Sequence, residues 1–179
     1  GDIVFSGEEF NTPGALTLMS RAGDIRLDSR IISGGNTELS ADHIRIGTTG
    51  LLASQSELAV ASINLDNLGL LYGRHALTLQ IDNILNNGDP TLNLPASLLS
   101  DGDIRIGRTD GGRAEEINNW GGRIESSSGS IEMTASLIRN INLGWSLSST
   151  TLPAEYSYSP SQWLWEIYYS FRHLVRKHR

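Results

Sequence analysis

The feature that most constrains this chain is a line of sequence that recurs after 19 residues, between residues 37 and 74. The two lines read TELSADHIRIGTTGLLASQ and SELAVASINLDNLGLLYGR, so that Leu39 recurs as Leu58 and Ile44 as Ile63. Apolar and polar residues alternate within each line, which indicates short strands with one inward face. Such units predict a parallel solenoid of about 19-residue coils, in which equivalent residues stack on one another.

The next line, HALTLQIDNILNNGDPTLN, tests this frame because strict alignment puts Asp82 at an inward position. A buried, unpaired carboxylate is costly and would mark a functional site. The segment also fits an arrangement with Leu77, Leu79 and Ile81 inward and a one-residue bulge before Ile84. We favour the bulge, because charged side chains are rarely buried without a partner.

Charge and composition narrow the function classes. Residues 1–155 carry 19 acidic residues and ten arginines, a net charge of −9, whereas residues 156–179 carry +3. An acidic body offers no basic face for phosphates, so we expect no nucleic-acid partner. The chain has no cysteine, which excludes a thiol nucleophile and cysteine-ligated metal. No run of 18 apolar residues occurs, so we expect no transmembrane segment.

Three features of the sequence carry a family resemblance. They are the paired L-x-L and I-x-I units, the GDIRL turn at residues 23–27, and the segment GGRIESSSGSIEMTASLIRNIN at residues 121–142. Over roughly residues 15–142 the chain resembles the filamentous-haemagglutinin repeats of two-partner secretion exoproteins, which include bacterial adhesins and effectors of contact-dependent growth inhibition. The resemblance implies a right-handed parallel β-helix, export through an outer-membrane transporter of the two-partner type, and a place on the bacterial cell surface. The sequence departs from clean repeats at residues 108–121 and after Asn142.

These observations divide the chain into three predicted regions. Residues 1–142 form an all-β, parallel β-helix, interrupted by an insertion loop near residues 108–121. Residues 143–160 form a linker. Residues 161–179 form an amphipathic, aromatic and basic α-helix that either caps the β-helix or begins another region, because apolar residues recur there at helical spacing. The chain begins in mid-pattern at Gly1, and we interpret it as a piece of a longer protein.

Large aromatic residues outside the clean repeat are the candidate partner-binding residues, since loops and apolar helix faces on a repeat scaffold often carry recognition. The alternatives are that the loop tryptophan packs against the rod and that the helix caps an open end or contacts a membrane surface. The candidates are Trp120, Trp163, Trp165, Tyr168, Tyr169 and Phe171.

We expect no catalytic, cofactor-binding or metal-binding residues. The carboxylates of the repeats do not recur on one ladder, and Lys177 is the only lysine. The four histidines lack the spacing of a metal site. The predicted function is a structural stalk of a secreted surface exoprotein that presents adhesive or toxic regions. The alternatives are a segment that itself binds a target-cell receptor and, remotely, a β-helix enzyme that acts on polysaccharides.

Overall fold

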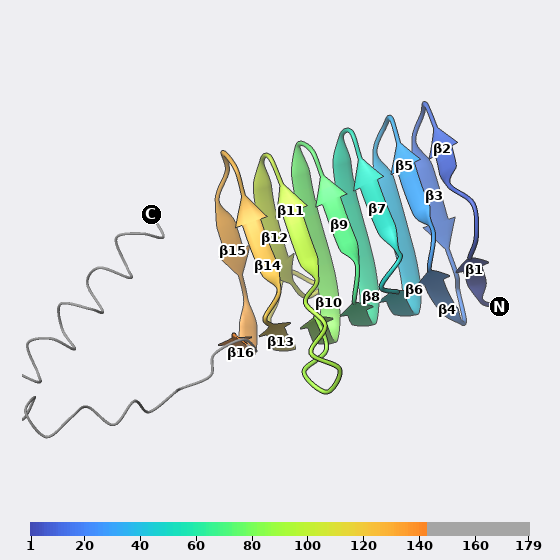
Figure 1. Ribbon diagram of the computed structural model, residues 1–179. Coiled ribbons are helices and arrows are strands. Elements are labelled where there is room, and N and C mark those ends of the chain that lie inside the picture. Colours follow the sequence, from blue (N-terminus) through green and yellow to red (C-terminus); the bar gives the residue numbers. More distant parts are fainter. Residues whose placement is uncertain (143–179) are drawn as a thin grey trace, which may run out of the picture. The chain divides into compact units, whose positions relative to one another are not determined.

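The computed structural model describes residues 1–142, which form a stack of coils built from β-strands (Figure 1). All pairings between the named strands are parallel. The predicted all-β class and parallel β-helix are therefore confirmed for this part of the chain. The predicted linker over residues 143–160 and the predicted helix over residues 161–179 lie outside the described residues.

The strands form two sheets that wrap a common core. The ten-stranded sheet has the order β1-β4-β6-β8-β10-β12-β15, with β3, β13 and β16 pairing beside this path. Its members are β1 (Ile3–Phe5), β3 (Leu16–Met19), β4 (Asp24–Leu27), β6 (Thr37–Ile46), β8 (Glu57–Asn67), β10 (Ala76–Asn87), β12 (Asp103–Gly107), β13 (Ala114–Trp120), β15 (Ile131–Met133) and β16 (Ala135–Ile141). The six-stranded sheet comprises β2 (Phe10–Thr12), β5 (Arg30–Ser33), β7 (Leu51–Ser54), β9 (Leu70–Gly73), β11 (Ser97–Ser100) and β14 (Arg123–Ser126).

The coils are not all 19 residues long. The predicted pairs Leu51–Leu70 and Leu52–Leu71 are confirmed in the register of β7 and β9. The predicted stacking of Leu39 on Leu58 is wrong, because Leu39 pairs with Val60, 21 residues on.

The length of one turn explains this difference. Four residues, Gly47 to Gly50, connect β6 to β7, whereas two residues, Leu68 and Gly69, connect β8 to β9. The longer turn makes one step 21 residues and the next step 19. A two-residue change keeps the inward–outward alternation of the strands, so the core is undisturbed.

The long strands bend where two successive residues face outward. In β8, Ser62 and Leu65 are buried, while Ile63 between them is 40% exposed. The prediction that Ile63 faces inward is therefore wrong, because the period of two is broken at this corner.

The corresponding bend in β10 explains the position of Asp82. The register of β10 on β8 gains one residue between Ile81 and Ile84, as the bulge interpretation predicts. Leu77, Leu79 and Ile81 are fully buried, and Asp82 is partly exposed at the corner. Its carboxylate accepts a hydrogen bond from the Thr109 hydroxyl.

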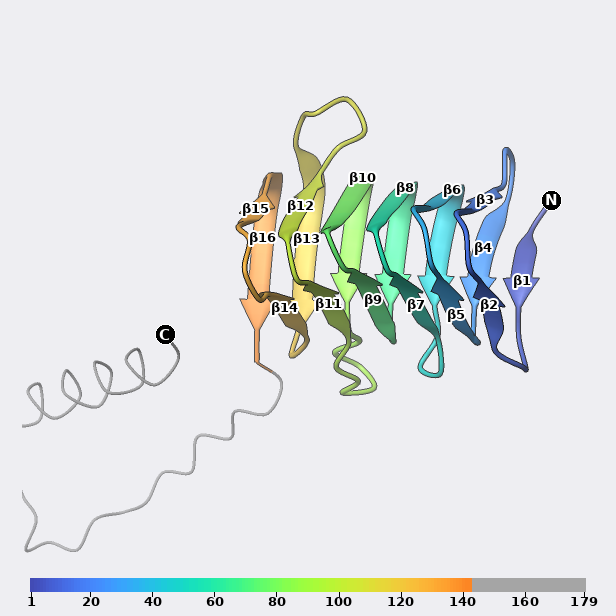
Figure 2. The same cartoon turned by 90° about the horizontal axis from the view of Figure 1, so that it is seen from above.

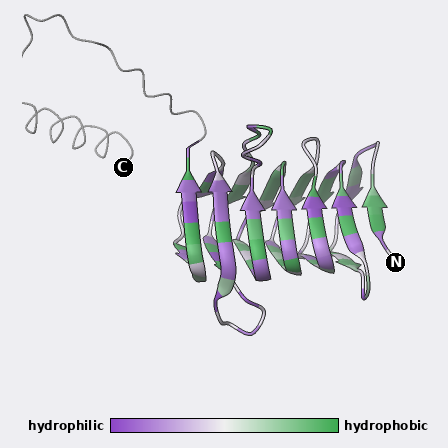
Figure 3. Cartoon of the chain, turned by 90° about the horizontal axis from the view of Figure 1, so that it is seen from below, coloured by the Kyte–Doolittle hydropathy of each residue, from purple (hydrophilic) through white to green (hydrophobic). Residues whose placement is uncertain are grey.

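Stacked apolar side chains form the core between the sheets. One ladder runs through successive coils of the ten-stranded sheet and another through the six-stranded sheet, and hydrophobic bands lie at similar height on neighbouring strands (Figure 3). The first ladder contains Ile25, Ile44, Leu65, Leu85 and Ile117; the second contains Ile31, Leu52, Leu71, Leu98 and Ile124. The shared inward face of these residues holds the two sheets together through apolar burial.

Two loops extend beyond the stack, one between β10 and β11 and one between β12 and β13 (Figure 2). The insertion loop predicted near residues 108–121 is wrong for its second half, because β13 (Ala114–Trp120) pairs in parallel with β10 and β16. Glu and Asn are poor strand formers, which hid this strand in the sequence. In β13, the side chains of Asn118 and Asn119 form hydrogen bonds with asparagines of the neighbouring coil.

Candidate functional site

Two columns of polar side chains stand side by side at the ends of the long strands. They arise from a dipeptide that recurs once per coil: Asp66-Asn67, Asn86-Asn87, Asn118-Asn119 and Arg139-Asn140. The register aligns these dipeptides directly across β8, β10, β13 and β16. Because successive strand residues point to opposite faces, the second residue of each pair turns inward and the first turns outward.

The inward column is an asparagine ladder. The Nδ2 of Asn67 donates to Oδ1 of Asn87 at 2.8 Å, and the Nδ2 of Asn87 donates to Oδ1 of Asn119 at the same distance. Asn119 continues the ladder to Oδ1 of Asn140, also at 2.8 Å. Asn67 and Asn87 are fully buried. An amide carries both a donor and an acceptor, so it can satisfy the coil above and the coil below.

The outward column forms a continuous hydrogen-bonded line along the same strands. Asp66 accepts hydrogen bonds from Nε2 of His43 and from Nδ2 of Asn86, each at 2.9 Å. The Asn86 Oδ1 accepts from Nδ2 of Asn118 at 3.1 Å and from the indole Nε1 of Trp120 at 3.3 Å. The column therefore ties one tryptophan to a carboxylate two coils away.

An ion pair ends this column. The Arg139 guanidinium donates to Oε2 of Glu116 at 2.6 Å and to Oδ1 of Asn118 at 3.0 Å. The hydrogen bond from Arg139, and then that from Asn118, lower the pKa of Glu116 below its ordinary value. Glu116 therefore stays ionised to a lower pH than an isolated glutamate does.

A cleft of about 290 Å³ opens beside the outward column, and we name it the Trp120 cleft. It is lined by Arg45, Asp66, Leu68, Asn86, Gly88, Asp89, Pro90 and Trp120. Leu68, Gly88 and Trp120 each follow one of the ladder asparagines, on successive coils. Gly88 supplies no side chain between the other two, which leaves room in front of the indole.

The β10–β11 loop forms one wall of the Trp120 cleft. The backbones of Asp89 and Leu94 exchange hydrogen bonds of 2.8 and 3.0 Å, and Oδ1 of Asp89 accepts from the Thr91 and Leu92 amides. Gly88 begins this loop with a φ of 95°, which favours glycine. A Cβ there would lie 2.5 Å from the Trp120 carbonyl oxygen, so a larger residue would displace the strand that holds the indole.

Several polar groups in the Trp120 cleft remain free for a ligand. Within residues 1–142, the Arg45 guanidinium makes no side-chain hydrogen bond or ion pair, although Arg45 and Asp66 are neighbours in register. The Asp89 carboxylate uses Oδ1 in its loop and leaves Oδ2 without a donor from the described residues. Among residues 1–142, the cleft therefore combines unpaired donors, an unpaired acceptor and an aromatic ring.

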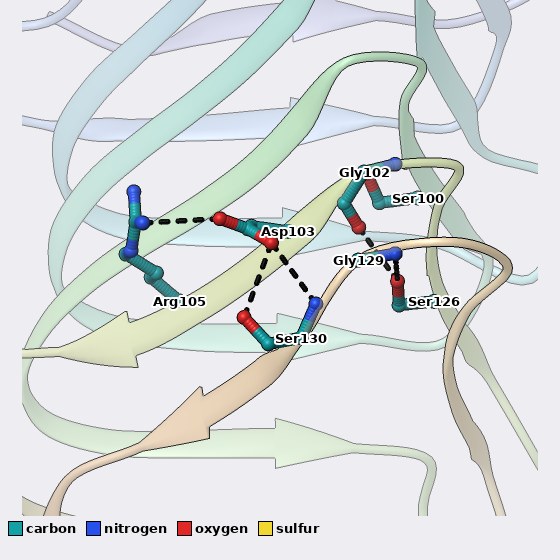
Figure 4. Close-up of polar contacts among 7 residues, drawn as sticks. All are labelled: Ser100, Gly102, Asp103, Arg105, Ser126, Gly129 and Ser130. Carbon is teal, nitrogen blue, oxygen red and sulfur yellow. Dashed lines mark hydrogen bonds and ion pairs between the residues drawn. The ribbon is translucent and has the colours of Figure 1, made fainter.

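A second polar cluster lies at the corner that precedes β12 and β15 (Figure 4). Asp103 accepts from the Ser130 amide at 2.9 Å and hydroxyl at 3.1 Å, and from Arg105 at 3.0 Å. Backbone and then side-chain hydrogen bonds from Ser130 hold the pKa of Asp103 below its ordinary value.

Serines close the adjacent turns of this cluster: Ser126 donates to the Gly102 carbonyl at 2.7 Å and accepts from the Gly129 amide at 2.8 Å (Figure 4). Through these hydrogen bonds the cluster joins one coil to the next.

Of the predicted partner-binding residues, the structure describes Trp120, at the end of β13, half-buried and facing the cleft that bears its name. Trp163, Trp165, Tyr168, Tyr169 and Phe171 lie outside the described residues. The other cleft residues, Arg45, Asp66, Asn86 and Asp89, were missed from the sequence. The recurring x-Asn dipeptide was the available signal, because it repeats in the motifs DNLG, NNGD and NNWG.

No model of a known protein family, no curated protein and no solved structure matches this chain. Within residues 1–142, no group of three or more His, Cys, Asp or Glu side chains is placed to hold a metal ion. The same residues contain no helix long and apolar enough to cross a bilayer.

Proposed function

We propose that this chain is a structural stalk segment of a secreted, cell-surface filamentous exoprotein, which presents adhesive or toxic regions to other cells. The observation that carries the proposal is the continuous parallel pairing through the seven strands from β1 to β15. A stack of coils in which each contacts its neighbours is suited to spacing, because its length grows with the number of coils. The resemblance to filamentous-haemagglutinin repeats supports the same role and export through a two-partner transporter.

Surface labelling tests this proposal. Antibodies raised against the purified chain should label intact cells of the source organism. Labelling that appears only after the cells are permeabilised would overturn the proposed location.

A coil duplication tests the spacer role on the purified chain. Repeating residues 37–76, a 21-residue step and a 19-residue step, adds two coils, which should lengthen the particle by about 10 Å, since parallel strands are spaced about 4.8 Å apart. Small-angle scattering measures the change in maximum dimension, and circular dichroism checks that the strand content is kept. An unchanged dimension with added residues unfolded would contradict a modular spacer.

A second function, recognition of a target-cell surface molecule, is favoured by the Trp120 cleft. The Arg45 guanidinium and Oδ2 of Asp89, which have no partner in the described part of the chain, lie beside a half-buried indole, a combination that the spacer role does not need. The labelled 179-residue chain should then bind target cells saturably. Trp120→Leu should weaken that binding, while non-saturable binding would remove this second function.

A further inference from the structure

We infer that the Trp120 cleft binds one neutral sugar unit of a surface glycan. The inference names the ligand class of the recognition function and rests on that second function. It is independent of the spacer role, which the stack of coils fulfils whether or not the cleft is occupied.

The first argument concerns the indole. The only polar atom of the Trp120 side chain is Nε1, and it already donates to Asn86 at 3.3 Å. What the side chain offers a ligand in the cleft is therefore apolar ring surface. A sugar ring has C–H-rich faces that pack against an aromatic ring while its hydroxyls remain at the rim.

The second argument concerns donors and acceptors. A hydroxyl group both donates and accepts, so neighbouring hydroxyls need donors and acceptors close together. The Trp120 cleft supplies the free Arg45 guanidinium as donor, and the free Oδ2 of Asp89 and remaining lone pairs of Asp66 as acceptors. The register of β6 on β8 places Arg45 beside Asp66, and the backbone hydrogen bonds between Asp89 and Leu94 fix Asp89 in the adjoining loop.

The third argument concerns charge and size. The cleft carries two carboxylates against one guanidinium, so an anionic sugar, a phosphate or a nucleotide would meet net repulsion. Its volume of about 290 Å³ lies just below the range for small-molecule sites, roughly 300–1,000 Å³. One uncharged sugar ring fits these limits better than a peptide, whose extended backbone would need a longer groove.

The experiment uses the full 179-residue chain and four neutral probes, the methyl pyranosides of mannose, galactose, glucose and N-acetylglucosamine. Saturation-transfer NMR detects binding and isothermal titration measures it, with methyl glucuronide as the anionic comparison. At least one neutral probe should bind, and more tightly than the glucuronide.

Three variants assign the binding to the cleft. Trp120→Leu, which removes the flat ring but keeps an apolar side chain, should weaken binding about tenfold. Arg45→Gln should weaken it about threefold, and the fold should be unaffected because Arg45 has no side-chain partner in residues 1–142. Tyr72→Leu is the matched control, because Tyr72 is an aromatic residue of β9 outside the cleft, and binding should not change.

The inference is overturned if no neutral probe binds, if Arg45→Gln binds as the parent chain does, or if the glucuronide binds best. Cell binding distinguishes it from the recognition function on which it rests. Saturable cell binding that survives periodate oxidation of the cell glycans would keep the recognition function and overturn the sugar, in favour of a protein receptor. Binding of the pyranosides without any cell binding would keep the sugar site and overturn the recognition of target cells.

Discussion

A single side chain in this molecule takes its role from the residues one coil above and one coil below it. The column Leu27, Ile46, Asn67, Asn87 and Asn119 shows this, because one inward position changes from apolar to amide partway along the stack. An amide at this position would be costly alone, but a run of amides satisfies each member. The strands that carry these asparagines also carry Asp66, Asn86 and Trp120 of the Trp120 cleft.

Substitution at Asn87 tests the ladder. Asn87→Ala removes the acceptor of Asn67 and the donor to Asn119, and we expect a loss of about 1–3 kcal/mol in the free energy of unfolding. Urea denaturation followed by circular dichroism measures it. Asn64→Ala is the control: Asn64 lies on the same sheet, half-buried, with no side-chain hydrogen bond in residues 1–142, and its removal should cost less than about 0.5 kcal/mol.

Acid should weaken the corner at Asp103. Its pKa is depressed in the folded chain, so its ionised form stabilises the fold above the ordinary value of 3.8, and this contribution is lost as the pH falls through the depressed pKa. Asp103→Asn should therefore be less stable than the parent chain at pH 7, and this deficit should shrink as the pH is lowered below 3.8. Chemical denaturation across this pH range measures the two curves. A difference that persists unchanged at pH 2 would contradict the assignment.

Along the strands, inward and outward side chains alternate in every coil, whereas the turns between strands differ in length. The β6–β7 turn is two residues longer than the β8–β9 turn, and the loop between β12 and β13 adds further residues. Neither change alters which residues of the strands face inward, because the additions lie outside the paired segments. The extra residue in β10 is accommodated at the corner, where two or three residues face outward in each long strand.

Insertion of one alanine tests this rule. Placed after Gly111, which has open space around it, the insertion should change the free energy of unfolding by less than about 1 kcal/mol, because loop length is inexpensive. Placed after Val60 in β8, the same insertion turns the rest of that half-strand over and exposes buried residues. We expect that variant to lose the cooperative unfolding transition, as measured by urea denaturation. Equal stability of the two variants would contradict a register held by core alternation.

For the described residues as a whole, stability should be greatest in the middle of the stack. Leu65 and Ile138 occupy the same ladder through Leu85 and Ile117, yet Leu65 is fully buried and Ile138 is 44% exposed. Nearest-neighbour contacts make the central coils two-sided and the last described coil one-sided. An apolar side chain at this position of the ladder should therefore contribute more to the free energy of unfolding in β8 than in β16.

Truncation of these two residues measures the gradient. Leu65→Ala should cost about 2–5 kcal/mol, the range for a buried leucine, whereas Ile138→Ala should cost about 1 kcal/mol or less. Equilibrium denaturation gives both values if unfolding is two-state, and hydrogen exchange of the β8 and β16 amides gives them coil by coil. Similar losses at both positions would show that another part of the chain covers β16.

The sequence by itself determined the architecture. Alternation in the two lines between residues 37 and 74 is enough to predict parallel coils. The alternation that ends at Ile81, together with the cost of burying the Asp82 carboxylate, is enough to predict the bulge. These features depend on which side chains are apolar, and that property can be read directly from the residue types. The aromatic character of Trp120 likewise marked it as a candidate for recognition.

Only the tertiary structure decided which residues meet. Coil length varies with each turn, so the partner of Leu39 is Val60 and the second half of the predicted insertion is a strand. The Trp120 cleft joins Arg45, Asp66 and Asp89 to a tryptophan far along the chain, and no local pattern contains that distance. Because the coils stack, residues one coil apart in the sequence lie in contact. The lengths of the turns determine which residues these are.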